Sequence, residues 1–303
     1  MTSEKNASAS NVGVIVKGIG GFYYVYSDGE IYECRARGKF RLDGLTPLPG
    51  DRVGFEPGEN RKGGFVTAIF DRTNQLKRPP VANVDQLVLV LSASRPRPDL
   101  ILADKLLIQA QRQRIDAMLV LNKCDVAESD VVRKIEENYP EQDFLFCCTS
   151  AMKKSGLDAL EENLNGKLSC FAGQSAVGKS SLLNALSQSF SFDTGEISRK
   201  TGRGRHTTRA VELRTLSDEA NSFIMDTPGF SMLELDVQPE KLPSLYPEMD
   251  AYAGQCRFDN CLHVNEPDCA IKAAVLEGTV PRGRYERYLI ILKELQDREA
   301  RRY

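Results

Sequence analysis

The segment from Gly173 to Ser180 has the residue types and spacing of a phosphate-binding loop. Its sequence, Gly-Gln-Ser-Ala-Val-Gly-Lys-Ser, follows an apolar run at 168–171 and precedes a segment with helical spacing. In this setting the backbone amides of the loop and of the helix N-terminus can hold phosphate groups. We therefore expect Lys179 to reach the terminal phosphates and Ser180 to bind Mg²⁺. An incidental glycine-rich turn is the alternative, and the strand-loop-helix context disfavours it.

A second motif selects the base of the nucleotide. Asn122-Lys123-Cys124-Asp125 directly follows the apolar run at 118–121. An aspartate carboxylate there can accept hydrogen bonds from both N1 and the exocyclic amine of guanine, and adenine does not offer that pair. Because a polar group left unpaired in a binding site is costly, discrimination should be large. The motif predicts that Asp125 makes the site specific for guanine.

Two shorter segments complete the expected nucleotide site. Thr149-Ser150-Ala151 follows the apolar run at 144–147 and fits a loop whose backbone amide closes over the guanine O6. Asp226-Thr227-Pro228-Gly229 follows the run at 223–225, so Asp226 would hold Mg²⁺ through water and the Gly229 amide would sense the γ-phosphate. The predicted nucleotide-binding residues are Asn122, Lys123, Asp125, Thr149, Ser150, Ala151, Gly173, Gln174, Ser175, Ala176, Val177, Gly178, Lys179, Ser180, Ser181 and Gly229.

A cluster of cysteine and histidine residues predicts a metal site. Four, one and five residues separate Cys256, Cys261, His263 and Cys269. Three thiolates and one imidazole fill a tetrahedral zinc site and leave no position for water, which describes a structural centre. Buried free thiols are the alternative, but a small region with few apolar residues would gain its missing stability from a metal ion.

The segments that must position these motifs alternate between strand-like and helix-like patterns. Apolar runs at 87–91, 118–121, 144–147, 168–171 and 223–225 predict buried strands, and 100–108 has helical spacing. This pattern is typical of an α/β layer with a largely parallel sheet. After about Val237 the strands stop, and 282–302 is expected to form one long charged helix. Its inner side should carry Tyr288, Leu289, Leu292 and Leu295.

The region from Val12 to about Asp71 differs, because short alternating runs are separated there by glycine-rich turns, as in a small antiparallel barrel. Four cations recur at every second residue and would share one face if they formed one strand: Arg35, Arg37, Lys39 and Arg41. Together with Tyr23, Tyr24 and Tyr26, they fit an oligonucleotide-binding barrel that contacts single-stranded or loop RNA. A solvated strand face above core tyrosines is an equally good interpretation. The segment 72–85 is expected to be a polar linker.

Composition limits the class of protein. The chain has 303 residues, of which 41% are apolar and 27% charged, as in ordinary globular proteins. No apolar run approaches the roughly 18 residues that span a membrane, and Met1 to Asn11 lacks the apolar core of a signal peptide. The eight cysteines fit a reducing compartment better than a disulfide framework. We expect a cytoplasmic monomer with no membrane partner.

The order of the motifs is permuted relative to an ordinary GTPase, because the guanine-reading motif precedes the phosphate loop. With the barrel, the Val81–Gln86 segment and the Cys/His cluster, this order resembles the small ribosomal subunit-dependent GTPase A family over almost the whole chain. The resemblance implies a multidomain α/β protein. We expect an OB-type β-barrel at 1–72, a linker at 73–85, a circularly permuted P-loop GTPase domain at 86–237 and an α-helical zinc-binding domain at 238–303.

The same resemblance implies a function. A protein of this kind hydrolyses GTP with Mg²⁺ as a late assembly factor of the small ribosomal subunit, and ribosome-stimulated hydrolysis times its release. Its cofactors are GTP or GDP, Mg²⁺ and one structural Zn²⁺, and its partners are the small subunit and its rRNA. A P-loop kinase would have no use for the guanine motif. A non-catalytic RNA-binding scaffold that uses GTP only for stability is the harder alternative.

The catalytic residues are the remaining prediction. The resemblance implies that Gly204 to Thr208 form the first switch, with Thr208 as a ligand of Mg²⁺ and the γ-phosphate beside Ser180 and Asp226. Many switch GTPases orient water with a glutamine after the magnesium loop, where this chain has Phe230. The predicted catalytic set is His206, Thr208 and Lys179. An RNA-contacting or merely exposed His206 is the alternative.

Two positions depart from the family pattern. Ala176 stands where glycine is usual, and Arg209 stands where a third threonine is common. Neither change removes a ligand. Ala176, however, places a methyl group near the phosphates and is expected to affect turnover.

Overall fold

The computed structural model describes residues 11–38, 40, 44–77, 79–140, 144–189, 211–217, 221–226 and 235–301. The chain forms two compact units, each made of several segments. One contains Met1–Asp85, Asn163–Cys170 and Leu186–Pro228, and the other contains Gln86–Glu162, Phe171–Ala185 and Gly229–Tyr303.

The N-terminal region is a closed barrel of five strands. These are β1 (Asn11–Ile19), β2 (Phe22–Ser27), β3 (Glu30–Ala36), β4 (Arg52–Glu56) and β5 (Gly64–Ile69), with η1 (Glu59–Arg61) before the last strand, in the order β1-β2-β3-β5-β4. The pair β3–β5 is parallel, and the other four pairs are antiparallel. Alternating side chains such as Ile15, Val25 and Val53 point inward and form the core.

Arg35 to Arg41 do not form one strand, because β3 ends at Ala36, so the condition for a shared face of the four cations is not met. The chain turns after Arg37, whose carbonyl accepts from the Phe40 N–H at 3.2 Å, and the Phe40 ring enters the barrel core. Arg35 lies over the Phe22 ring at 4.6 Å, and Arg37 pairs with Glu56 at 2.7 Å. Lys39 and Arg41 lie outside the described residues.

The tyrosines of the barrel were interpreted either as surfaces for stacking RNA bases or as core residues, and the structure shows a different environment for each. Tyr26 is buried and meets the Phe223 ring edge-on at 5.5 Å, so it is a core residue. Tyr23 is half-buried and packs against the barrel core, whereas Tyr24 is half-buried and its hydroxyl donates to Glu33 at 3.5 Å.

The expected polar linker contains a small sheet. Strands β6 (Gln75–Lys77) and β7 (Pro80–Ala82) pair antiparallel, and Leu76, Val81 and Val84 are buried. Arg72 forks onto the fully buried carboxylate of Asp51, with both nitrogen–oxygen distances at 2.7 Å. This bidentate pair and the hydrogen bonds from Ala82 to Pro49 and from Asn83 to Gly50, both 2.9 Å, therefore hold the segment to the barrel region, which a polar linker would not require.

A six-stranded sheet follows, in the order β10-β9-β8-β11-β13-β12. Its strands are β8 (Gln86–Ser92), β9 (Asp116–Asn122), β10 (Leu145–Cys148), β11 (Leu168–Ala172), β12 (Arg214–Ser217) and β13 (Ser222–Asp226). The pairs β8–β9 and β9–β10 are parallel, whereas β12–β13 is antiparallel. The five predicted strands are all present, and β12 was not predicted.

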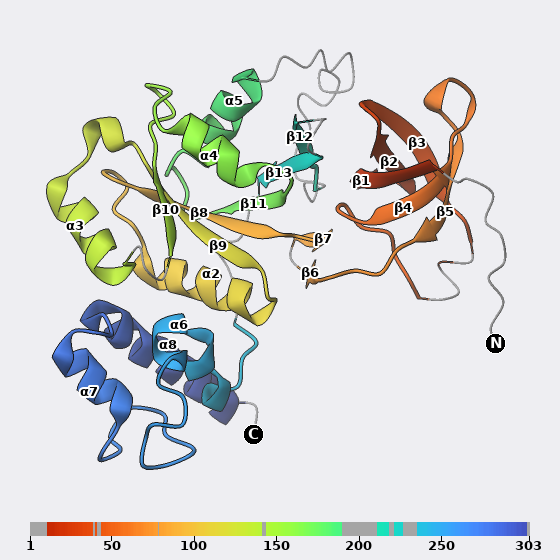
Figure 1. The fold of residues 1–303 in the computed structure, drawn as a ribbon. Helices are drawn as coiled ribbons and strands as arrows, with labels where there is room; N and C mark the ends of the chain where they lie inside the picture. The colour runs from red at the N-terminus through yellow and green to blue at the C-terminus, as the bar shows by residue number, and fades with distance from the viewer. Residues whose placement is uncertain are drawn as a thin grey trace. The chain divides into compact units, whose positions relative to one another are not determined.

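Helices cover both faces of this sheet. Figure 1 shows α2 (Leu100–Arg112) and α3 (Ser129–Asn138) on one face, and α4 (Leu157–Leu164) and α5 (Lys179–Ser189) on the other. The short η2 (Cys124–Val126) lies between β9 and α3. The strand order reverses between β8 and β11, and in open α/β sheets ligands bind at the carboxyl ends of the strands beside such a point.

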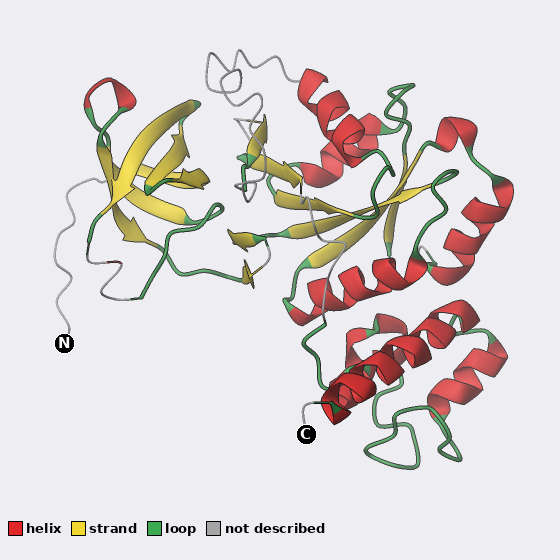
Figure 2. Cartoon of the chain, turned by 180° about the vertical axis from the view of Figure 1, so that it is seen from behind, coloured by secondary structure: helices red, strands yellow, loops and turns green. Residues whose placement is uncertain are grey.

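The C-terminal region is helical (Figure 2). It contains η4 (Pro239–Lys241), η5 (Pro243–Leu245), α6 (Pro247–Asp250), α7 (Ala270–Glu277) and α8 (Arg282–Ala300). As predicted, Tyr288, Leu292 and Leu295 of α8 are buried, and Leu289 is half-buried. No helix in the described part of the chain has the length and apolar character needed to cross a membrane.

Five side chains bury their polar groups between α8 and its neighbours. Arg284 donates to Asp104 of α2 at 2.5 Å and to Glu248 of α6 at 2.6 Å, and Arg287 donates to Asp104 at 2.6 Å. Tyr139, after α3, donates to Asp104 at 2.5 Å. Burial alone would lower the pKa of Arg284, but Asp104 and Glu248 more than compensate and raise it. We call these five residues the buried charge cluster.

Candidate nucleotide site and metal centre

The phosphate loop links the end of β11 to the start of α5, and two glycines permit its path. Gly173 has φ +140°, and a Cβ there would lie 2.3 Å from the Val90 carbonyl oxygen. Gly178 has φ +101°, and its Cβ would lie 2.2 Å from Nδ2 of Asn122. Packing against backbone and the positive φ therefore both require glycine at 173, whereas at 178 the positive φ favours glycine and a side chain would displace the Asn122 amide.

The lysine of the loop lies over its own backbone. The Lys179 ammonium donates to the carbonyls of Gly173 and Gln174 at 2.8 and 2.9 Å. It is therefore held at the loop that the sequence predicts for the phosphates. Ser175, Ala176, Ser180 and Ser181 of this loop and helix are exposed, whereas Val177 is buried.

The guanine motif contacts the phosphate loop directly. Asn122 Nδ2 donates to the Val177 carbonyl at 2.9 Å, and Lys123 Nζ donates to the Ala176 carbonyl at 2.8 Å. Lys123 Nζ also donates to the Arg95 carbonyl at 2.6 Å. The structure thus brings together two motifs separated by about 50 positions in the sequence.

The third segment packs against the guanine motif. Ser150 Oγ donates to Oδ1 of Asp125 at 2.6 Å, and the Ala151 N–H donates to Oδ1 of Asn122 at 3.2 Å. Thr149 lies between them, and its carbonyl accepts from the Cys124 N–H at 3.0 Å. Ser150 is fully buried and Asp125 is exposed. The Asp125 carboxylate, held by Ser150, therefore faces solvent beyond the carboxyl end of β9.

Sequence reasoning missed the loop at 93–99. Its Arg95 carbonyl holds Lys123, and the Asp99 N–H donates to the Gln174 side chain at 3.2 Å. Backbone atoms make both contacts, so no residue type marks them in the sequence. The available signal was position, because the loop follows β8 beside the point where strand order reverses.

Several predicted site residues fall outside the part of the chain that the structure describes. His206, Thr208 and Gly229 lie outside the described residues. Asp226 ends β13, but its side chain also lies outside the described part of the chain. Of the predicted Mg²⁺ ligands, the described part therefore contains only the side chain of Ser180, which stands in the first turn of α5.

The Cys/His cluster has the dimensions of a tetrahedral metal site. The ligand atoms of Cys256, Cys261, His263 and Cys269 lie within 4.8 Å of one another. Two sulfurs on tetrahedral zinc would be about 3.8 Å apart, and a sulfur and a nitrogen about 3.6 Å. The sulfurs of Cys256 and Cys269 are 3.9 Å apart, and Nδ1 of His263 is 3.6 and 3.3 Å from them. The donor set therefore fits a metal such as zinc.

The surroundings hold the metal ligands in place. The Glu266 carboxylate accepts from the N–H groups of Leu262 and Val264 at 2.8 and 2.7 Å, and Tyr285 donates to the His263 carbonyl at 2.6 Å. Burial lowers the pKa of His263, which favours the neutral imidazole that binds metal. Burial also raises the pKa of Cys261 to about 12, and a cation would offset this cost of ionisation.

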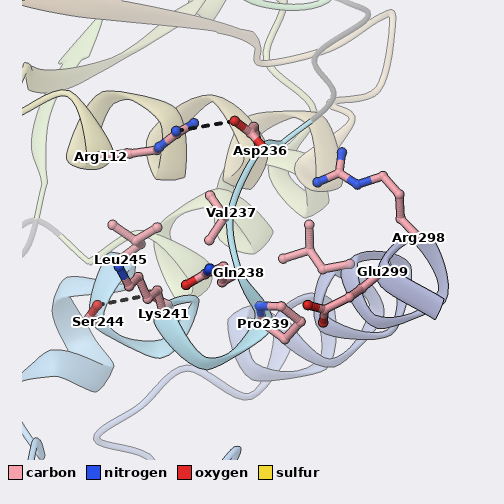
Figure 3. A pocket seen from close by; sticks show the side chains of 11 residues that line it. Arg112, Asp236, Val237, Gln238, Pro239, Lys241, Ser244, Leu245, Arg298 and Glu299 are labelled. Atoms are coloured by element: carbon pink, nitrogen blue, oxygen red, sulfur yellow. Dashed lines mark hydrogen bonds and ion pairs between the residues drawn. The ribbon is translucent and has the colours of Figure 1, made fainter. Parts of the chain in front are cut away.

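A cavity of about 430 Å³ lies elsewhere in the same unit (Figure 3). Arg112 of α2, the segment after Leu235 and the end of α8 line it, and Arg112 pairs with Asp236 at 3.6 Å. Arg298 and Glu299 lie on its other side. Its walls carry charges of both signs and none of the nucleotide motifs, so it is not the predicted nucleotide site.

The sheet, the phosphate loop and the adjoining guanine loops define a class of protein: a P-loop GTPase in which the base-reading motif precedes the phosphate loop. Comparisons agree with this class. Residues 69–236 match the RsgA GTPase family, and residues 12–66 match the RsgA N-terminal domain.

Similar proteins and structures extend over nearly the whole chain. The Caldanaerobacter subterraneus protein named small ribosomal subunit biogenesis GTPase RsgA is 44% identical over 96% of this chain and 98% of its own length. The Geobacillus kaustophilus protein of that name is 42% identical, over 95% and 99%. Thermotoga maritima YjeQ has a TM-score of 0.80 at 35% identity, covering 95% and 99%. YloQ, described as a circularly permuted GTPase, has a TM-score of 0.79 at 35% identity, covering 98% and 99%.

This chain therefore belongs to the RsgA family of GTPases. The predicted family, the GTPase activity and the three-part fold class are confirmed.

Proposed function

We propose that this GTPase acts on the small ribosomal subunit as a late maturation factor, and that contact with the subunit stimulates hydrolysis and so times release. The names of the relatives support the ribosomal setting, since each is a small ribosomal subunit biogenesis GTPase. In this proposal the barrel and the C-terminal helices contact rRNA, and the protein works as a cytoplasmic monomer.

One observation carries the nucleotide part of the proposal. Asn122 bonds the phosphate loop at Val177 while Asp125, three residues later, is exposed and supported by Ser150. A nucleotide whose phosphates lie on the loop 173–180 would have its base read by Asp125 and closed by the Ala151 amide. This arrangement favours GTP over ATP because the carboxylate can accept hydrogen bonds from both N1 and the exocyclic amine of guanine, and adenine does not offer that pair.

Mg²⁺ would be held by Ser180, Thr208 and Asp226, and would neutralise charge on the phosphate oxygens. Lys179 would exchange its carbonyl contacts for the terminal phosphates. His206 is our proposed group for orienting or activating water, because Phe230 cannot do so. Replacing His206 by alanine should slow subunit-stimulated turnover by roughly 10- to 10,000-fold with little change in GTP affinity. Stimulated turnover that survives the substitution would assign the role to rRNA or to a backbone group.

We propose one structural Zn²⁺ bound by Cys256, Cys261, His263 and Cys269. The near-tetrahedral spacing of the donor atoms supports it, and four protein ligands leave no position for a reacting water. The ion would hold together the loop between α6 and α7, which carries all four ligands.

The deciding experiment measures GTP turnover by the purified full chain with and without small ribosomal subunits. A clear increase supports the proposal, and no increase contradicts it. Subunit affinity should also be higher with a non-hydrolysable GTP analogue than with GDP. Equal affinities would favour the scaffold alternative. Competition by ATP as effective as that by GTP would favour a kinase.

A further inference from the structure

Two cysteines, Cys124 and Cys148, lie on adjacent segments where the proposed base-reading loops, 122–126 and 149–151, leave the sheet. Strands β9 and β10 pair in parallel with Leu121 opposite Cys148. The chain then turns back after β9, so the Cys124 N–H bonds the Thr149 carbonyl at 3.0 Å and the Cys124 thiol lies 3.1 Å from the Leu121 carbonyl. The Cys124 side chain therefore rests on the residue paired with Cys148.

The two thiols differ in exposure. Cys148 is exposed and Cys124 is partly buried, while Cys147 is buried on the opposite side of β10, as strand alternation requires. Burial raises the pKa of Cys124 to about 12, and both the charge of Cys148 and a side-chain hydrogen bond to it act in the same direction. The register of the strands and the contact of Cys124 with Leu121 therefore place the two cysteines on adjacent segments, with Cys148 accessible to small oxidants.

No other pair among the eight cysteines has this arrangement. Cys34, Cys147 and Cys170 are buried, and the remaining three belong to the candidate metal centre. Cys124 directly precedes Asp125, and Cys148 stands two residues before Ser150. Any bond between the two thiols would therefore join both base-reading loops.

We propose that Cys124 and Cys148 form a reversible disulfide with hydrogen peroxide and that this bond lowers affinity for guanine nucleotides. The Cys148 sulfur attacks one peroxide oxygen, which gives a sulfenic acid and one water. The Cys124 sulfur then attacks the Cys148 sulfur, forming the S–S bond and expelling hydroxide, which leaves as water with the Cys124 proton. Two thiols lose two electrons to the peroxide, and a dithiol reverses the reaction.

Closing the bond must move the base-reading loops. A disulfide needs sulfurs about 2.05 Å apart with a defined dihedral angle, so Cys124 has to leave the Leu121 carbonyl. The 2.6 Å hydrogen bond between Ser150 and Asp125 spans the same two loops and would be displaced with them. This consequence rests on the proposed guanine site, whereas formation of the bond does not.

The first experiment tests the bond. The full chain is treated with peroxide, alkylated and digested, and the peptides linked through Cys124 are sequenced by mass spectrometry. Cys148 is the expected partner. Cys148→Ser should abolish the link, and Cys147→Ala should retain it. Absence of the link in the unsubstituted chain, or a link to Cys147, overturns the proposal.

The second experiment measures the dissociation constant of a fluorescent GDP before and after peroxide. We expect about tenfold weaker binding, equivalent to about 1.4 kcal/mol, restored by dithiothreitol and absent in Cys148→Ser. A zinc-sensitive dye monitors metal release, because oxidation of the metal centre must not account for the change. A formed disulfide with unchanged affinity overturns the regulatory part. Failure of the proposed guanine site would appear separately, as weak binding by the reduced chain.

Discussion

The nucleotide loops and the C-terminal helices both depend on polar side chains, but the partners of these side chains differ between the two regions. In the nucleotide loops, Asn122 and Lys123 bond the backbone of a neighbouring loop, and Asp125 stays exposed. At the C-terminal helices, Arg284 of α8 and Asp104 of α2 are 1% and 0% exposed and satisfy each other. The first region is organised around a ligand that arrives later. The second is completed by the protein itself or, in our proposal, by a metal ion, so damage there should affect stability before binding.

The largest effect should follow loss of a metal ligand. Cys261→Ala should abolish stoichiometric zinc and unfold the loop around it, because metal binding in small zinc domains supplies about 10 kcal/mol or more. Nucleotide binding should persist. Metal analysis with a fluorescent-nucleotide titration measures both. Cys34→Ala, which removes a buried barrel thiol, is the control and should keep its zinc. Freshly purified protein without zinc would refute the site.

Opening the buried charge cluster should come next. Arg284→Ala leaves the carboxylates of Asp104 and Glu248 buried without their main partner, so the free energy of unfolding should fall by about 3–5 kcal/mol. Urea denaturation measures it. Arg282→Ala on the same helix removes a side chain that is 82% exposed and should cost less than about 0.5 kcal/mol. Similar losses for both variants would show that burial of the cluster does not matter.

A smaller change is expected at Asp125, whose carboxylate we propose reads the base. Asp125→Asn should weaken GTP binding by about 10- to 100-fold, since hydrogen bonds to charged groups contribute about 1.5–3 kcal/mol. It should favour xanthine nucleotides, whose 2-oxo group replaces the amine. Competition titrations and a melting curve test the contrast between the regions, because stability should hardly change. A variant that binds GTP as tightly as the original chain would disprove the assignment.

The smallest effect concerns Ala176, whose φ of +63° lies in the left-handed region. Ala176→Gly removes backbone strain, which stabilises the folded state by about 1–2 kcal/mol. The greater conformational freedom of glycine stabilises the unfolded state by about 0.5–1 kcal/mol. We expect a net gain of about 0.5–1 kcal/mol in thermal denaturation. Ser175→Gly, at a position without positive φ, gains no such relief and should destabilise. Equal shifts in the two variants would argue against strain at Ala176.

Local sequence patterns predicted most of the helices and strands. They did not predict the polar contacts between residues that are far apart in the chain. Continuous apolar runs identified β8 to β11 and β13, and the motif spacing identified the loops that bring Asn122 to Val177. Strand β12 carries no such run and was missed. The buried charge cluster was missed because Asp104 and Arg284 are 180 positions apart and each resembles an ordinary surface charge in its own helix. The early end of β3 was missed because burial of Phe40 outweighed the alternation of cations.

The separation between Asp104 and Arg284 also orders events during synthesis. At roughly 5–20 residues per second, a ribosome adds the 180 intervening positions in about 10–40 s. Throughout that interval Asp104 of α2 lacks the two arginines of α8 that pair with it in the folded protein, so its carboxylate has to remain hydrated. The surface of α2 that carries Asp104 must therefore wait for the last long helix, although by then every strand of the sheet has been made.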